Sequence, residues 1–412
     1  MIPNTGAFVG KTIFVSGGSR GIGKAIALKL AKDGANVVIA AKTTEKHPKL
    51  EGTIFTAAQE IEAAGGKCLP VQCDLRDEDA VKNAFDKTLQ KFGGLDVLVN
   101  NASAISLTGT EDTTMKKYDL MHQINIRGTF MSTKYAIPAL KKGNNPHILN
   151  LSPPLLMEPI WFGPHVAYTM AKYGMSMCVL GMAQEFKEYG IGVNALWPRT
   201  AIWTAAMAML GGGGETAKMC RTVDIIADSA YSILSEDSKK VTGNFFIDEV
   251  YLREKGVTDF DQYAIVKGGD LMADFFIPQS LMKGLVSIYS SSDNAKEGDS
   301  VNNDSGIVDK IFAKAQSVIT DEVKKQLNAV MVFNVSGKNY LIDAHASRPL
   351  KIELVTDPPK SDVTMVTDEE TFIKMSKGEV KPTSAFMSGK LKIKGNIAIG
   401  MKFEKLFKEL KV

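Results

Sequence analysis

The chain has 412 residues, of which 44% are hydrophobic and 23% are charged. One hydrophobic core rarely supports that length, so two domains are expected. The absence of any run of eighteen apolar residues argues against a segment that spans a bilayer. The 49 basic and 46 acidic residues leave a net charge of +3, which gives no electrostatic case for a nucleic-acid partner.

The cysteine and histidine residues show no pattern of a metal site. Cys68, Cys73, Cys178 and Cys220 lack metal-ligand spacing, and the five histidines are scattered, so no metal ligand is predicted. Free thiols in apolar surroundings indicate a reducing, intracellular compartment. Residues 1–6 lack the basic and apolar regions of a secretory signal, which favours synthesis in the cytosol.

A glycine-rich turn joins the first predicted strand, residues 12–16, to a helix over 24–33. Glycines in this place let the backbone approach a pyrophosphate, whose charge then faces the helix N-terminus. A tight strand-to-helix connection without a ligand is the alternative. The residues predicted to bind a dinucleotide here are Gly17, Gly18, Ser19, Arg20, Gly21, Ile22 and Gly23.

The second predicted strand, 36–41, is followed by Lys42, where a fold specific for NAD usually has an acid for the ribose hydroxyls. Lys42 and Arg20 could neutralise a 2′-phosphate, so NADP(H) is the expected cofactor. A solvated surface lysine is the alternative. Asp74 follows the third strand, 67–72, where its carboxylate could accept from an adenine amino group or cap the next helix.

Polar residues continue along the same predicted edge. Strand 95–99 runs into Asn101 and Ala102, a turn that suits close approach to a ligand, and strand 147–151 runs into Ser152. Asn125 lies inside a predicted helix over 121–134, an unfavourable place that suggests a functional reason. The alternation of strands and helices, with a sixth strand over 192–196, predicts an α/β fold, a doubly wound parallel sheet of the Rossmann kind.

Tyr168 and Lys172 lie four positions apart in a predicted helix, so their side chains share one face. A phenol has a pKa near ~10, and an adjacent cation lowers it by favouring the phenolate. The same spacing also occurs in ordinary amphipathic helices. The polar residues that follow the preceding strands favour a catalytic role for the pair in this chain.

These residues together resemble the short-chain dehydrogenase/reductase family over about residues 10–250. The resemblance implies hydride transfer between a nicotinamide cofactor and a carbonyl or alcohol, with Tyr168 as proton donor in reduction. It further implies that Lys172 lowers the tyrosine pKa and holds the nicotinamide ribose, that Asn125 supports a proton relay, and that Ser152 polarises the carbonyl. The family usually has Pro-Gly after the sixth strand, where this chain has Pro198 and Arg199.

A substrate-side lid is predicted over residues 203–221, where glycines would allow movement and Met207 and Met209 would line an apolar pocket. A core helix followed by a loop is the alternative. The first domain is expected to end at residue 277, and the polar segment 278–306 to be a flexible linker.

The second domain, 307–412, is predicted to be a smaller α+β unit with helices over 307–317 and 368–376 and strands over 330–335, 340–344, 351–354 and 363–366. Residues 384–396 resemble the sterol carrier protein type two domain. That resemblance implies an apolar tunnel for a fatty acid, acyl-CoA or sterol, with a tail helix carrying Phe403 and Phe407 near its mouth. Lys390, Lys392 and Lys394 alternate along a predicted strand as one solvated face, which could also meet an anionic membrane transiently.

The combination of both domains in this order resembles a family of two-domain proteins, and that resemblance implies a location in peroxisomes or in mitochondria. The final residues Leu410, Lys411 and Val412 differ from a Ser-Lys-Leu type peroxisomal address. A peroxisome is therefore the expected location, with the mitochondrion and the cytoplasm as alternatives. A homo-oligomer is kept as an expectation, although no residue pattern specifies it.

Overall fold

The computed structural model forms two compact units. It describes residues 1–45, 51–210, 214–286, 308, 311–312, 314–315, 319–380, 382–387 and 390–395. The first unit contains the described residues up to 286, and the second contains those from 308 on. Residues 278–286, assigned to the linker from sequence, are instead part of the first unit. In the parts described, no helix is both long and apolar enough to cross a membrane.

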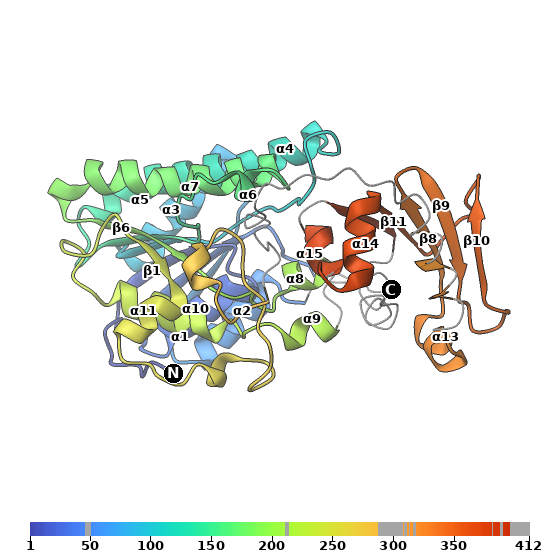
Figure 1. The fold of residues 1–412 in the computed structure, drawn as a ribbon. Coiled ribbons are helices and arrows are strands. Elements are labelled where there is room, and N and C mark those ends of the chain that lie inside the picture. Colours follow the sequence, from blue (N-terminus) through green and yellow to red (C-terminus); the bar gives the residue numbers. More distant parts are fainter. Residues whose placement is uncertain are drawn as a thin grey trace. The chain divides into compact units, whose positions relative to one another are not determined.

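The first unit is built on a seven-stranded, all-parallel sheet with the strand order β3-β2-β1-β4-β5-β6-β7 (Figure 1). The order reverses between β1 and β4, and ligands of such sheets bind beyond the strand ends at this switch point. The predicted doubly wound parallel sheet is confirmed. The strands are β1 (Thr12–Ser16), β2 (Asn36–Ala41), β3 (Lys67–Gln72), β4 (Val97–Asn100), β5 (His147–Asn150), β6 (Gly192–Trp197) and β7 (Phe245–Ile247).

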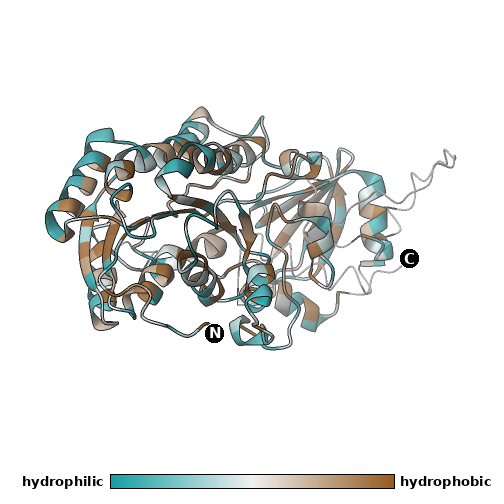
Figure 2. Cartoon of the chain, turned by 90° about the vertical axis from the view of Figure 1, so that its left-hand side faces the viewer, coloured by the Kyte–Doolittle hydropathy of each residue, from teal (hydrophilic) through white to brown (hydrophobic). Residues whose placement is uncertain are grey.

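Helices cover both faces of this sheet, which explains why its central strands are buried along their whole length (Figures 1 and 2). One core lies under α1 (Gly21–Ala31), α2 (Ile54–Ala63), α10 (Asp224–Leu234) and α11 (Asp248–Glu254). The other lies under α3 (Glu78–Phe92), α5 (Gly128–Leu140) and α7 (Val166–Glu185). Shorter helices are α4 (Met115–Met121), α6 (Pro159–Phe162), α8 (Ala205–Met209), α9 (Gly214–Lys218), η2 (Lys187–Tyr189), η3 (Asp261–Tyr263) and η4 (Gln279–Leu281).

A π-helical turn, η1 (His122–Arg127), interrupts the long helix formed by α4 and α5. Such turns insert an extra residue into the helix and are frequent at functional sites. Asn125 lies in this turn and is fully buried. The neighbouring α7 approaches closely, because a Cβ on Gly174 would lie 2.5 Å from the side chain of Ile126. The sequence predicted the helix but not its π turn.

The second unit has a five-stranded mixed sheet with the order β10-β9-β8-β11-β12. Its core gathers stacked rings of Phe312, Tyr340 and Phe372, and this confirms the predicted separate α+β unit. Lys390, Lys392 and Lys394 are all exposed, as predicted for one solvated face. The predicted tail helix lies outside the described residues. The elements are α13 (Asp321–Leu327), β8 (Val330–Val335), β9 (Lys338–Asp343), β10 (Lys351–Val355), β11 (Val363–Thr367), α14 (Glu369–Lys377), α15 (Pro382–Met387) and β12 (Leu391–Gly395).

Candidate active site

The glycine turn after β1 requires glycine at two of its positions. Gly17 has φ of +68°, and a Cβ there would lie 2.9 Å from the Cα of Ala102. A Cβ on Gly23, in the first turn of α1, would lie 2.4 Å from the amide nitrogen of Asn101. Side chains at either position would therefore displace the turn or the end of β4.

Asn101 clamps this turn from the neighbouring strand. Its side-chain amide donates to the carbonyls of Ser16, at 3.0 Å, and Gly17, at 3.1 Å. The Ser16 hydroxyl in turn accepts from the backbone N–H groups of Asn101 and Ala102. Gly18 and Ser19 lie in the same turn, and Ile22 lies in the first turn of α1, which contains no acidic residue. This cradle fits a dinucleotide pyrophosphate by shape and by the helix dipole.

Arg20 makes contacts that the sequence did not predict. Its guanidinium donates to the backbone carbonyls of Glu51, at 2.9 Å, and Gly52, at 2.7 Å, and thus fixes the loop before α2 against the glycine turn. Burial lowers the pKa of Arg20. Lys42, by contrast, is 71% exposed at the end of β2. Lys42 is therefore the more accessible cation of this pair for a 2′-phosphate.

Asp74 lies beside Lys42 at the sheet edge, but its carboxylate is held by Arg76. The guanidinium of Arg76 donates to both carboxylate oxygens, at 2.9 Å and 2.6 Å, and Lys42 Nζ lies 3.5 Å away. These bonds, the Arg76 hydrogen bond foremost, hold the pKa of Asp74 well below its usual range. The suggested capping role is wrong, because Asp77 caps α3.

The helix α7 carries Tyr168 and Lys172 on its buried side, 4% and 3% exposed. Lys172 Nζ donates to the carbonyl of Leu151 at 2.7 Å, just beyond the end of β5. Ser176 and Tyr173 fix the same loop by donating to the carbonyls of Pro153, at 2.6 Å, and Leu156, at 2.7 Å. The pair is thus placed at the carboxyl edge of the sheet, where the glycine turn also lies.

The surroundings of Lys172 make its ammonium easier to deprotonate. Burial lowers the pKa of its ammonium to about 7, opposed by the negative charge of Asp274. His165, at the N-cap of α7, packs edge-to-face on Tyr168 with ring centroids 5.7 Å apart. Burial lowers the pKa of His165 to about 4, so this ring is neutral at physiological pH.

Ser152 and Asn125 are both fully buried near this edge. The hydroxyl of Ser152 has no hydrogen-bond partner in the part of the chain that the structure describes, and this leaves it able to bond an entering oxygen. Asn125 is engaged differently: its amide exchanges two hydrogen bonds with the backbone of Ala104, at 2.8 Å and 3.1 Å. Asn125 therefore ties the π turn to the loop that follows β4.

An aromatic wall beside Tyr168 comes from residues that the sequence did not single out. Phe276 is fully buried, and its ring lies 6.0 Å from those of Tyr168 and Trp197 and 5.3 Å from that of Tyr173. The indole N–H of Trp197 donates to the carbonyl of Phe275 at 2.7 Å. The apolar composition of residues 271–277 was the only available signal, and it does not specify this position.

Arg199 stands where the family usually has the glycine of Pro-Gly. It holds the C-terminal segment of the first unit in place. Its guanidinium donates to the carbonyls of Leu281 and Lys283, and pairs with Glu249 at 2.7 Å. Glu249 is 3% exposed and also pairs with Arg221, at 2.6 Å, and Arg253, at 2.8 Å. Burial raises the pKa of this carboxyl, but the arginines outweigh it and lower the pKa to about 2.

Replacing Glu249 with glutamine is expected to destabilise the first unit by about 3 kcal/mol, because it leaves buried arginines without their counter-charge. The folded pKa is below the usual 4.5, so the stabilisation is complete above pH 4.5 and disappears as the pH falls towards 2. Urea unfolding followed by tryptophan fluorescence checks this, since Trp161, Trp197 and Trp203, the chain's three tryptophans, lie in this unit.

The matched control is Glu60→Gln. Glu60 pairs with Lys24 at 2.8 Å but is 47% exposed, so the change is expected to cost less than about 1 kcal/mol. Equal losses of unfolding free energy in Glu249→Gln and Glu60→Gln would contradict a stabilising role of the buried ion pairs of Glu249. A destabilisation by Glu249→Gln that persists at pH 2 would also contradict it.

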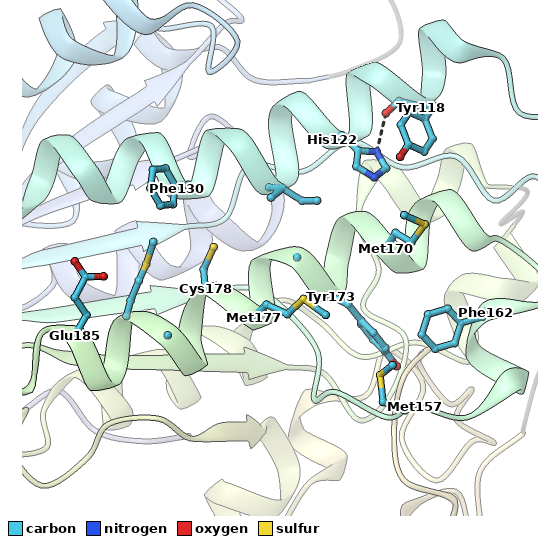
Figure 3. Close-up of a pocket in the computed structure, with 14 residues that line it drawn as sticks. Tyr118, His122, Phe130, Met157, Phe162, Met170, Tyr173, Met177, Cys178 and Glu185 are labelled. Atoms are coloured by element: carbon cyan, nitrogen blue, oxygen red, sulfur yellow. Dashed lines mark hydrogen bonds between the residues drawn. The ribbon is translucent and has the colours of Figure 1, made fainter.

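A separate apolar groove of about 630 Å³ lies between η1, α5 and α7 (Figure 3). Ile126, Phe130, Met170, Tyr173 and Met177 are among the residues that line it. Met170 and Met177 are on the exposed side of α7, whereas Tyr168 and Lys172 are on its buried side. The groove is thus separate from the Tyr168 site.

The predicted lid contains α8 and α9, with residues 211–213 outside the described part. Neither helix has a buried residue, and Met209 is 74% exposed. The alternative of a core helix in this segment is therefore wrong. Its role as a lid stays a prediction.

A parallel sheet in this order, a glycine cradle at its switch point and a Tyr-Lys pair at the same edge define a dinucleotide-binding oxidoreductase of the α/β class. Comparison with known proteins agrees. The chain matches the short chain dehydrogenase family over residues 11–210 and the SCP-2 sterol transfer family over 308–408.

Full-length relatives share both parts. The chain is 52% identical to hydroxysteroid dehydrogenase-like protein 2 of Homo sapiens and of Bos taurus, covering 100% of this chain and 99% of each relative. It is also similar to the solved short chain dehydrogenase of Mycobacterium thermoresistibile, at 50% identity and a TM-score of 0.63, covering 66% of this chain and 96% of that one. The chain therefore belongs to the short-chain dehydrogenase/reductase family, in the hydroxysteroid dehydrogenase-like protein 2 group with a C-terminal sterol-carrier domain.

Proposed function

We propose that this protein is an NADP(H)-dependent oxidoreductase that interconverts the carbonyl and hydroxyl groups of a lipid, fatty-acyl or steroid-like, with Tyr168 as general acid and base. The observation that carries the proposal is the placement of Lys172 one helical turn from Tyr168, buried at the same sheet edge as the glycine cradle. When bound, the nicotinamide cofactor supplies or accepts the hydride.

The chain's own residues then have distinct tasks in reduction. The Tyr168 hydroxyl gives its proton to the substrate oxygen as that oxygen gains negative charge. Lys172 favours the phenolate left behind, because a positive charge one turn away stabilises it. Ser152 contributes a hydrogen bond to the carbonyl oxygen. Asn125 holds the π turn against the loop of Ala104, next to which protons can return from solvent through water.

The proposed preference for NADP(H) rests on Lys42. Replacing Lys42 with aspartate is expected to weaken NADPH binding about ten- to a hundredfold, because a charge-assisted contact becomes a repulsion, and to weaken NADH binding much less. Fluorescence titration with both nucleotides measures this.

Lys91→Asp is the control for Lys42→Asp, since Lys91 is exposed in the last turn of α3, away from the glycine turn. It should leave both affinities within twofold. Equal losses of NADPH and NADH in Lys42→Asp would overturn the 2′-phosphate assignment.

The sterol-carrier domain suggests the substrate class. An apolar ligand held by a tethered domain is presented at a high effective concentration, which favours substrates of low solubility. We propose that this domain retains or delivers a fatty acid, acyl-CoA or sterol. The exposed Lys390, Lys392 and Lys394 would support transient contact with an anionic membrane.

A peroxisome is proposed as the location of this protein on the family resemblance, with the mitochondrion and the cytoplasm as alternatives.

A homo-oligomer is proposed because the groove face of α5 and α7 exposes large apolar side chains, among them Phe130 at 56% and Met177 at 55%.

A second candidate function is a lipid-binding or transfer protein whose first domain binds nucleotide but turns over little. Two departures from the usual residues of the family, Pro153 after Ser152 and Arg199 after Pro198, favour it. NADPH oxidation by the wild-type protein over fatty aldehydes, ketones and steroids separates the two. Turnover of any of these supports the oxidoreductase, whereas NADPH and lipid binding without turnover supports the alternative.

A further inference from the structure

Three different groups surround the buried ammonium of Lys172. Its Nζ donates to the carbonyl of Leu151 at 2.7 Å, lies 3.7 Å from the sulfur of Met175, and lies over the ring of Trp197, 4.9 Å from the ring centroid. A lysine ammonium has three N–H donors and no acceptor. One carbonyl, one thioether sulfur and one aromatic face therefore match its three donors.

The aromatic face matters because Lys172 forms no ion pair in the part of the chain that the structure describes. Asp274 is the acid that favours its charged form, but burial raises the pKa of Asp274 itself to about 8, so this carboxyl is mostly protonated at neutral pH. A desolvated cation is attracted to the negative face of an aromatic ring, and most strongly to that of tryptophan. The indole of Trp197 therefore favours the ammonium without depending on an ionised acid.

Trp197 is itself fixed at the carboxyl edge of the sheet. It is the last residue of β6, and Leu151 follows directly after β5, the neighbouring strand. The indole N–H donates to the carbonyl of Phe275 at 2.7 Å, the ring packs 6.0 Å from that of Phe276, and the residue is 7% exposed. Two adjacent strand ends thus hold the ammonium from different elements than the helix that carries it.

We propose that Trp197 is a positioning residue of this site, whose indole face works with the carbonyl of Leu151 to hold the charged ammonium of Lys172 one helical turn from Tyr168. The inference deepens the proposed function, because it rests on the role of Lys172 there. The charge of Lys172 can be measured without turnover, so a failure of this inference is distinct from a failure of the enzyme assignment.

The test is the titration of the Lys172 ammonium, followed by NMR of protein labelled with ¹³C at lysine Cε and assigned with Lys172→Met. Trp197→Leu keeps an apolar side chain but removes the aromatic face, and is expected to lower the pKa of Lys172 by about one unit. Trp197→Phe keeps an aromatic face and is expected to restore part of this loss. Both variants lose the N–H bond to Phe275, so that bond does not account for a difference between them.

Trp203→Leu is the matched control. Trp203 is half-buried and lies six residues further along the chain, whereas the ring under the Lys172 ammonium is that of Trp197. The control variant is expected to leave the pKa of Lys172 unchanged.

A pKa of Lys172 that is unchanged or raised in Trp197→Leu would overturn the proposal, as would equal values in Trp197→Leu and Trp197→Phe. Should Trp197→Leu fail to fold, 5-fluorotryptophan is incorporated into the unmutated chain. It keeps the shape and the N–H bond of the indole while fluorine withdraws electron density from the ring face. A smaller downward shift of the Lys172 pKa then supports the proposal, and an unchanged value overturns it.

Discussion

Replacing Tyr168 with phenylalanine is expected to lower NADPH-dependent carbonyl reduction about a hundred- to ten-thousandfold. The substitution removes only the hydroxyl that gives its proton to the substrate oxygen, and positioned general acids contribute effects of that size. The ring packing against His165 and Phe276 is retained, so NADPH binding and the midpoint of thermal unfolding should change little. Initial rates with a fatty aldehyde, together with fluorescence titration of NADPH, measure both quantities.

Tyr173→Phe is the matched control, five residues further along α7. Its hydroxyl donates to the carbonyl of Leu156 at 2.7 Å, so its loss is expected to cost about 1 kcal/mol of stability and to leave the rate within a few-fold. Comparable rate losses in the two variants would show that the effect of Tyr168→Phe comes from packing rather than from the proton.

Replacing Gly23 with alanine is expected to destabilise the first unit by about 1–3 kcal/mol and to weaken NADPH binding severely. The new Cβ would lie 2.4 Å from the amide nitrogen of Asn101 and 2.9 Å from the carbonyl of Gly17. Asn101 is the clamp of the glycine turn, so moving it distorts the cradle itself. Urea unfolding by tryptophan fluorescence and NADPH titration test the two effects.

Gly181→Ala is the control for Gly23→Ala. Gly181 also lies in a helix, α7, and a Cβ there would meet nothing within 4 Å. This change is expected to stabilise the helix by roughly 0.5–1 kcal/mol and to leave NADPH binding unaltered. An unchanged NADPH affinity in Gly23→Ala would contradict the assignment of the turn as the cofactor cradle.

The sequence predicted the first sheet well because its strands are short apolar runs separated by helices of clear period. It also predicted the polar residues after β3, β4 and β5, since parallel strands bring their carboxyl ends to one edge. Those predictions depend on local pattern and on topology, and both can be read along the chain. The π turn at Asn125 is a different case, because nothing in residues 122–127 marks an inserted residue.

What the sequence could not predict was which side chains meet across long separations. The sequence suggested that Arg20 binds a phosphate. In the structure Arg20 donates to the carbonyls of Glu51 and Gly52, although α1 and β2 separate them from it in the sequence. Phe276 packs on Tyr168 although about a hundred residues separate them in the sequence, and no spacing relates the two. Such contacts are decided by tertiary packing.

The most direct test of the central claim is the transfer of deuterium from NADPH labelled at the nicotinamide C4 to a fatty aldehyde. The predicted result is an alcohol that has gained one deuterium on its carbinol carbon, detected by mass spectrometry with the wild-type protein and reduced at least a hundredfold with Tyr168→Phe. Equal labelling by wild type and Tyr168→Phe would contradict the role of Tyr168. NADPH binding without labelled alcohol, from fatty aldehydes, ketones or steroids alike, would contradict the oxidoreductase itself.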